Sequence, residues 1–202
     1  MRLFKVRGWL QLSGPKKDKA NFPFSLVLMN DNTKQPVGAE GSKIGDAVSL
    51  HIVADEIVNN PNFNPASIPQ KYVYVFTINK LGKMTLIYPD KKGGNLHNKF
   101  PQMNPDGQIN KDLVLAELEV EEPVGTDYLF LLATDEQITT YAMLFEQDGV
   151  RGINMRGEKG EPEKNPLGKI LDIGNEKNMT RDFKPKTPSN WVLYKLQAKT
   201  HK

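Results

Sequence analysis

The feature that most constrains the fold is an unbroken apolar run over residues 128–133, which ends in Thr134, Asp135 and Glu136. Successive side chains of a strand point to opposite faces, so both faces of this run would be apolar. A strand with one side in water alternates apolar and polar residues instead. The run therefore predicts a strand that is buried on both faces, at the centre of a β domain.

Further strands are predicted where apolar and polar residues alternate. These segments are residues 2–12, 24–29, 47–54, 71–78, 84–88, 113–120 and 191–198. In the first segment the alternation places Trp9 on the polar side. Between residues 71–78 and 84–88 the turn contains Gly82, which suits a positive φ, and predicts a hairpin. Over residues 113–120 the inward-facing side chains are expected to be Val114, Ala116, Leu118 and Val120.

This pattern favours a mainly β fold, an antiparallel β-sandwich of about eight strands with long loops and at most one or two short helices. A partly open β-barrel is the alternative. We expect residues 1–202 to form a single β domain, with a loop-rich, partly mobile segment over residues 147–188. Because the strand pattern begins almost at the first residue, we expect the domain to be the C-terminal part of a longer protein.

Composition narrows the function classes. The chain has no cysteine, which excludes disulfides, thiolate metal sites and a cysteine nucleophile within it. Its formal net charge of +3 does not indicate a nucleic-acid-binding protein. No apolar run approaches the ~20 residues of a membrane span, and no signal peptide is recognisable. We expect a soluble protein whose compartment is left open, either the cytoplasm or, for a fragment of a secreted precursor, the periplasm.

No motif in the sequence indicates catalysis. No serine lies in a Gly-x-Ser-x-Gly motif, and the three histidines are not paired. We therefore predict no catalytic residue and no cofactor. Asn104, Asp106 and Asp112 have the spacing of calcium ligands, but an uncharged Gln102 holds the first position and no helix is predicted on either side. A turn before the next strand is the favoured interpretation of this loop.

Eight motifs follow one another in the order found in a known family. They are residues 6–12, 22–26, 45–50, 71–76, 82–89, 125–136, 165–168 and 187–191. As an ordered set they resemble the C-terminal accessory domain, of the domain-of-unknown-function type, of bacterial caspase-family peptidase-like proteins. The resemblance implies a non-catalytic domain that binds a protein partner, such as a caspase-like peptidase domain in cis. Any peptidase activity would reside in that separate domain.

The leading hypothesis is thus a binding or regulatory domain that acts by protein–protein contact. Loops on a rigid sheet often carry recognition, so the expected interaction surface is Thr134, Asp135 and Glu136, together with Trp9. A carbohydrate or cell-envelope binding module, using exposed aromatic rings such as Trp9 or Tyr141, is the alternative. A third hypothesis is a stand-alone hydrolase built from dispersed carboxylates and His51.

Overall fold

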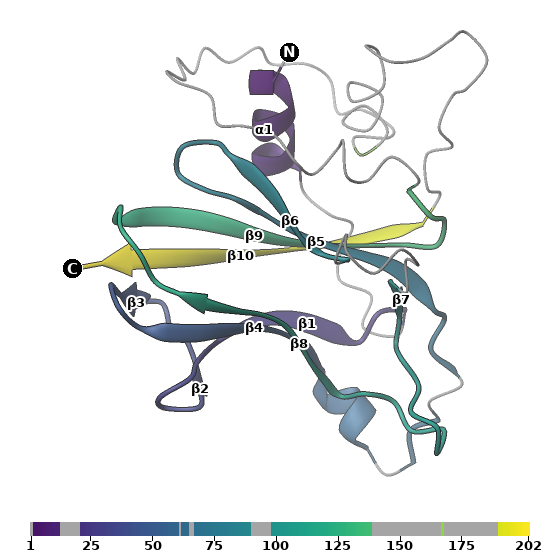
Figure 1. Cartoon of the computed structure of the whole chain (residues 1–202). Helices are drawn as coiled ribbons and strands as arrows, with labels where there is room; N and C mark the ends of the chain where they lie inside the picture. The colour runs from purple at the N-terminus through teal and green to yellow at the C-terminus, as the bar shows by residue number, and fades with distance from the viewer. Residues whose placement is uncertain are drawn as a thin grey trace, which may run out of the picture.

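The computed structural model describes residues 2–12, 21–60, 62–64, 67–89, 98–138, 167 and 190–202, with side chains from residue 7 onward. These residues form two β-sheets that pack face to face, and one helix covers the outer side of the larger sheet (Figure 1). The mainly β fold predicted from the sequence is confirmed. No helix in the described part of the chain is long and apolar enough to cross a membrane.

Each sheet is assembled from strands that are distant in sequence. The smaller sheet has the order β2-β1-β4-β8, with bounds Gln35–Pro36, Phe24–Asn30, Ala47–Ala54 and Asp112–Glu119. The larger sheet has the order β3-β10-β9-β5-β6, with bounds Ser42–Lys43, Trp191–His201, Gly125–Thr134, Lys71–Ile78 and Met84–Tyr88. β7 (Lys99–Phe100) also pairs with β5. Paired strands are antiparallel, except that β3 runs parallel to β10.

The central strand is the one that the apolar run predicts. β9 lies between β10 and β5 and contributes to two separate cores. Leu129 and Leu131 face the smaller sheet, and Phe130 and Leu132 face the opposite way. The first core fills the space between the sheets and includes Phe24, Leu26, Leu28, Val48, Leu50, Ile52, Val73, Val75, Phe100 and Val192. The second core, on the outer side of the larger sheet, is covered in part by the helix.

The prediction of a strand over residues 2–12 is wrong, because this segment forms the helix α1 (Arg2–Gln11). Trp9 in the helix and Leu12, the residue that follows its last position, are both buried. The outer face of β9 is apolar, and its removal from water is favourable. The helix α1 covers part of this face and buries Trp9 against it. Lys195 on β10 donates from Nζ to the Leu10 carbonyl at 2.7 Å, which satisfies a carbonyl in the last helical turn.

The predicted β5–β6 hairpin is confirmed, and Gly82 in its turn has φ 73°. In β8 the predicted inward side chains are partly wrong. Val114 is 51% exposed, whereas Leu113 and Leu115 pack against the core. The cause is a β-bulge, since the pairing with β4 skips Leu115 and the alternation changes phase there. Of the segment 147–188, only Leu167 falls within the described residues.

Candidate functional site

A cleft of about 300 Å³ opens between the two sheets. It lies where β9 begins and where the connection from β8 to β9 crosses from one sheet to the other (Figure 1). The lining comes from both sheets, from the β5–β6 turn and from that connection. The lining residues include Leu28, Ser42, Val48, Thr77, Lys80, Leu118, Glu119, Val120, Glu121, Glu122, Asp127, Leu129, Ala198 and Lys199.

The walls of the cleft continue the core between the sheets. Leu28 and Val48 come from the smaller sheet, and Leu129 and Ala198 come from the larger one. The sheets therefore hold an apolar space open at one end of the molecule, as the mouths of β-barrels often do. Leu118 on β8 is 41% exposed and forms part of the same wall. Aliphatic groups of a ligand would meet apolar side chains here.

A buried hydroxyl lies in this apolar wall. Ser42 is 4% exposed, and its Oγ has no hydrogen-bond partner among the described residues. Ser42 is held by the parallel pairing of β3 with β10, opposite Thr200. Gly41 allows that close approach, because it has φ 88° and a Cβ there would lie 2.4 Å from the Lys199 carbonyl oxygen. The oxygen is itself inaccessible, so its burial without a partner among the described residues is a local cost of the fold.

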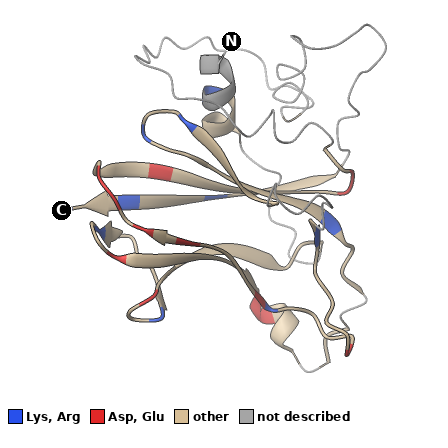
Figure 2. Cartoon of the chain, in the orientation of Figure 1, with Lys and Arg blue, Asp and Glu red and all other residues tan. Residues whose placement is uncertain are grey.

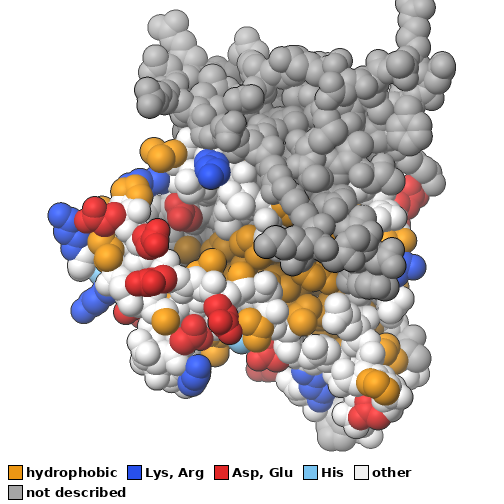
Figure 3. All heavy atoms as spheres, in the orientation of Figure 1, with side chains coloured by type: hydrophobic (Ala, Val, Ile, Leu, Met, Phe, Trp, Pro, Cys, Tyr) orange, Lys and Arg blue, Asp and Glu red, His pale blue; other side chains and the backbone are white. Residues whose placement is uncertain are grey.

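Charged side chains surround the cleft. Glu119, Glu121 and Glu122 are exposed carboxylates at its rim, and Asp127 is half-buried. The cleft is lined by four acidic residues and by two basic ones, Lys80 and Lys199. Figure 2 shows acidic residues along β8 and the connection that follows it. In Figure 3 acidic side chains gather at the same end, beside a band of hydrophobic side chains between the sheets.

Lys80 is held in place by two contacts across the cleft. Its main-chain N–H donates to Asp127 Oδ1 at 3.0 Å, and its Nζ donates to the Val124 carbonyl oxygen at 2.6 Å. These bonds tie the β5–β6 turn to the start of β9 and to the segment before it. The Lys80 ammonium therefore binds a carbonyl group and not the rim carboxylates Glu119 and Glu121.

The residues 134–136, predicted as an interaction surface, lie at the far end of β9 from the cleft. Thr134 is fully buried, and its Oγ1 donates to the Glu136 carbonyl oxygen at 2.7 Å. Asp135 accepts from the Asn190 N–H at 3.3 Å and donates its own N–H to the Asn190 carbonyl oxygen at 3.2 Å. These contacts link β9 to the start of β10. Asp135 is exposed and Glu136 is half-buried, whereas Thr134 is buried.

Trp9, the fourth residue of that predicted surface, is fully buried. Its ring meets Phe76 edge-on, with centroids 4.8 Å apart, and lies 6.4 Å from Phe130. Phe76 and Phe130 are themselves stacked at 5.0 Å. Trp9 thus completes an aromatic cluster in the second core and presents no ring to a ligand. Tyr141, the other aromatic residue proposed for carbohydrate binding, lies outside the described residues.

The three candidate calcium ligands lie in two different elements, and each element has its own hydrogen bonds. Asn104 and Asp106 lie in a tight turn, where the Gly107 N–H donates to the Asn104 carbonyl oxygen at 2.9 Å. Asp112 lies on β8, and its Oδ1 is 2.6 Å from His51 Nδ1. Among the described residues no three His, Asp or Glu side chains gather as a metal site would require. The arrangement fits the interpretation of this loop as a turn before a strand.

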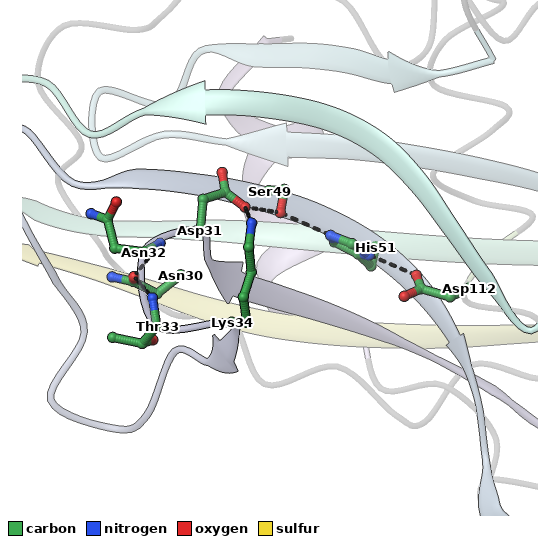
Figure 4. Close-up of polar contacts among 8 residues, drawn as sticks. All are labelled: Asn30, Asp31, Asn32, Thr33, Lys34, Ser49, His51 and Asp112. Atoms are coloured by element: carbon green, nitrogen blue, oxygen red, sulfur yellow. Dashed lines mark hydrogen bonds and ion pairs between the residues drawn. The ribbon is translucent and has the colours of Figure 1, made fainter.

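A line of short hydrogen bonds crosses the outer face of the smaller sheet (Figure 4). Ser49 Oγ donates to Asp31 Oδ1 at 2.6 Å, His51 Nε2 lies 2.8 Å from Ser49 Oγ, and His51 Nδ1 lies 2.6 Å from Asp112 Oδ1. The order Ser–His–Asp is that of a catalytic triad. However, the single hydroxyl hydrogen of Ser49 is directed to Asp31, and Ser49 is only 5% exposed.

All three of these contacts are hydrogen bonds only when three protons lie between the four groups. Because the Ser49 hydrogen goes to Asp31, the contact between His51 Nε2 and Ser49 Oγ is a hydrogen bond only when Nε2 carries a hydrogen. A histidine that donates to Ser49 cannot withdraw its proton, which an activated nucleophile requires. The line therefore fits a structural link between the β1–β2 turn, β4 and β8, and gives no support to a hydrolase built on His51.

Comparison of the chain with protein-family models, with curated proteins and with solved structures gives no match. The functional interpretation therefore rests on the residues and their geometry. Sequence reasoning missed the cleft, although one signal was present. Acidic residues recur at positions 117, 119, 121 and 122, just before the strand that begins at Gly125.

Proposed function

We propose that the chain is a non-catalytic binding domain that contacts a partner protein and takes a basic side chain of that partner into the cleft. The observation that carries the proposal is a cleft of about 300 Å³ that has apolar walls and an acidic rim. A ligand with an apolar stem and a positive charge matches these two properties together.

Lysine and arginine have this composition. Their side chains bury an aliphatic stem and keep a charged end near water. The stem would lie between Leu118, Leu129 and Ala198, and the cationic end would meet Glu119 or Glu121. An acidic or uncharged polar side chain would leave those carboxylates without a counter-charge. The proposal therefore excludes acidic partners by charge and favours basic ones.

The ordered motifs support the same class of function, because the accessory domains that they resemble are expected to act by contact with a protein, such as a caspase-like peptidase domain in cis. The carbohydrate alternative has less support. It named Trp9 or Tyr141 as the exposed ring; Trp9 is buried between α1 and the larger sheet, and Tyr141 lies outside the described residues. Among the described residues that line the cleft, none is an aromatic residue on which a sugar could stack.

The test is a titration of the ¹⁵N-labelled chain with N-acetyl-lysine methylamide, followed by NMR. The probe has about 14 non-hydrogen atoms, and at roughly 0.3 kcal/mol per atom its Kd should be about 1 mM. We expect amide shifts confined to cleft residues such as Ser42, Leu118 and Thr200. Glu121→Lys should weaken the binding, and Glu56→Lys, an equal charge change on the short helix Glu56–Asn59, should not. Shifts scattered over the surface, or equal effects of the two variants, would overturn the proposal.

A further inference from the structure

β8 borders the cleft and forms an outer edge of the smaller sheet. In the strand order β2-β1-β4-β8 it pairs with β4 on one side, and no strand in the described part of the chain pairs with its other side. Such an edge carries main-chain N–H and C=O groups that can accept another strand. Two large hydrophobic residues are exposed on it, Val114 at 51% and Leu118 at 41%.

The hydrogen bonds at the end of β8 show which groups point outward. The Val120 N–H donates to the Asp46 carbonyl oxygen at 2.9 Å, so Val120 faces the chain that leads into β4. The Ala47 carbonyl, opposite Glu119, instead accepts from the Asp31 N–H at 2.9 Å on the β1 side. Since bonding alternates along an antiparallel pair, the main-chain groups of Glu117 and Glu119 point away from β4.

The negative charge of this edge determines which strands can pair with it. Glu117 and Glu119 are exposed, and Glu121 and Glu122 follow at the cleft. A second copy of β8 laid against the first would bring like charges together, which is unfavourable. The same carboxylates attract a strand with basic residues. The bulge at Leu115 interrupts the edge, so the usable ladder is the part beside the cleft, from Ala116 onward.

We propose that β8 is a docking edge on which an extended basic segment of the partner protein adds as a further strand. This inference rests on the proposed function, because it takes the basic partner of the cleft and specifies how its main chain is held. The partner residue opposite Leu118 lies on the cleft side of the added strand, since Leu118 lines the cleft. Its two neighbours lie on the outer side, beside Glu117 and Glu119, and should be basic as well.

The probe is the peptide acetyl-Thr-Val-Arg-Lys-Arg-Val-Thr-amide, and the readout is amide hydrogen exchange in the full chain. At a peptide concentration about ten times its Kd, the edge is free roughly one-tenth of the time. Exchange at the Glu117 and Glu119 amides should therefore slow about tenfold. The amides of Leu118 and Val120, which face β4, should change much less. Unchanged exchange at Glu117 and Glu119 in the presence of bound peptide would overturn the inference.

N-methylation of the peptide separates strand addition from plain charge attraction. When the peptide lysine lies opposite Leu118, the main-chain N–H groups of the two arginines face β8. Methylation of both of these main-chain nitrogens should therefore abolish binding. Methylation of the main-chain nitrogens of the lysine and the two valines should leave binding nearly intact. Equal affinity of the two methylated peptides would refute strand addition. The double variant Glu117→Lys, Glu119→Lys should weaken binding of the parent peptide roughly tenfold, whereas Glu56→Lys should not.

The two proposals fail in different ways. If N-acetyl-lysine methylamide shifts the cleft amides but the peptide leaves Glu117 and Glu119 unprotected, strand addition is wrong and the cleft proposal stands. If the lysine probe shifts no cleft amide, the proposed function is wrong, whatever the peptide does at the edge.

Discussion

Replacement of Trp9 by alanine tests the helix and the second core together. Trp9 is fully buried and touches both Phe76 and Phe130. Loss of a buried tryptophan side chain costs about 3–5 kcal/mol of unfolding free energy. Because α1 covers one face of the larger sheet and the core between the sheets does not contain Trp9, we expect the lower end of this range, about 3 kcal/mol.

The assay is equilibrium unfolding in urea. With a slope of roughly 2 kcal/mol/M, a loss of about 3 kcal/mol lowers the midpoint by about 1.5 M. Trp9→Phe keeps an aromatic ring against Phe76 and should lose less than half as much. The chain has two tryptophans, so in Trp191→Phe the fluorescence reports on Trp9 alone. That emission should be blue-shifted and resistant to acrylamide quenching.

A midpoint change below about 0.3 M for Trp9→Ala would refute this reasoning, because a buried ring in contact with two others cannot be removed at so little cost. Ready quenching of Trp9 fluorescence by acrylamide would refute it as well, since a buried ring is shielded from the quencher. Either result would return Trp9 to the surface, where the strand prediction placed it, and would reopen its role in binding.

Two further predictions concern the smaller sheet and the core between the sheets. Ser49→Ala should cost about 1–3 kcal/mol in urea unfolding, since it removes the hydrogen bonds of Ser49 with Asp31 and with His51, whereas Asp112→Ala should cost less because Asp112 is 58% exposed. Burial, and then the nearby Asp55 carboxylate, raises the pKa of Tyr194 above its ordinary value of 10.0. Its neutral form is favoured by folding, so unfolding free energy should be level below pH 10 and fall above it, and the fall should be shallower in Tyr194→Phe.

The sequence was sufficient for those strands whose burial follows from their own residues. β9 carries apolar side chains on both faces, and this alone predicts a central strand. The same observation implies a cover on each face, but it does not say which segment supplies it. Residues 2–12 supply part of that cover as a helix, because the burial of Trp9 against Phe76 outweighs the local alternation.

Features that depend on contacts between distant segments could not be predicted. The bulge at Leu115 exists only in the pairing of β8 with β4, so the exposure of Val114 does not follow from its own strand. The cleft needs Ser42, Lys80 and the segment after β8 to meet, and they come from three separate parts of the sequence. The acidic residues before Gly125 were visible, but their grouping around an apolar opening requires the fold.

The central claim is that the cleft recognises a positive charge on an aliphatic stem. The most direct measurement compares the affinities of N-acetyl-lysine methylamide and N-acetyl-norleucine methylamide, which share the stem and differ in the ammonium group. We predict that the lysine probe binds about tenfold more tightly at low salt, and that the difference shrinks as ionic strength rises. Equal affinity of the two probes at every salt concentration would contradict the claim.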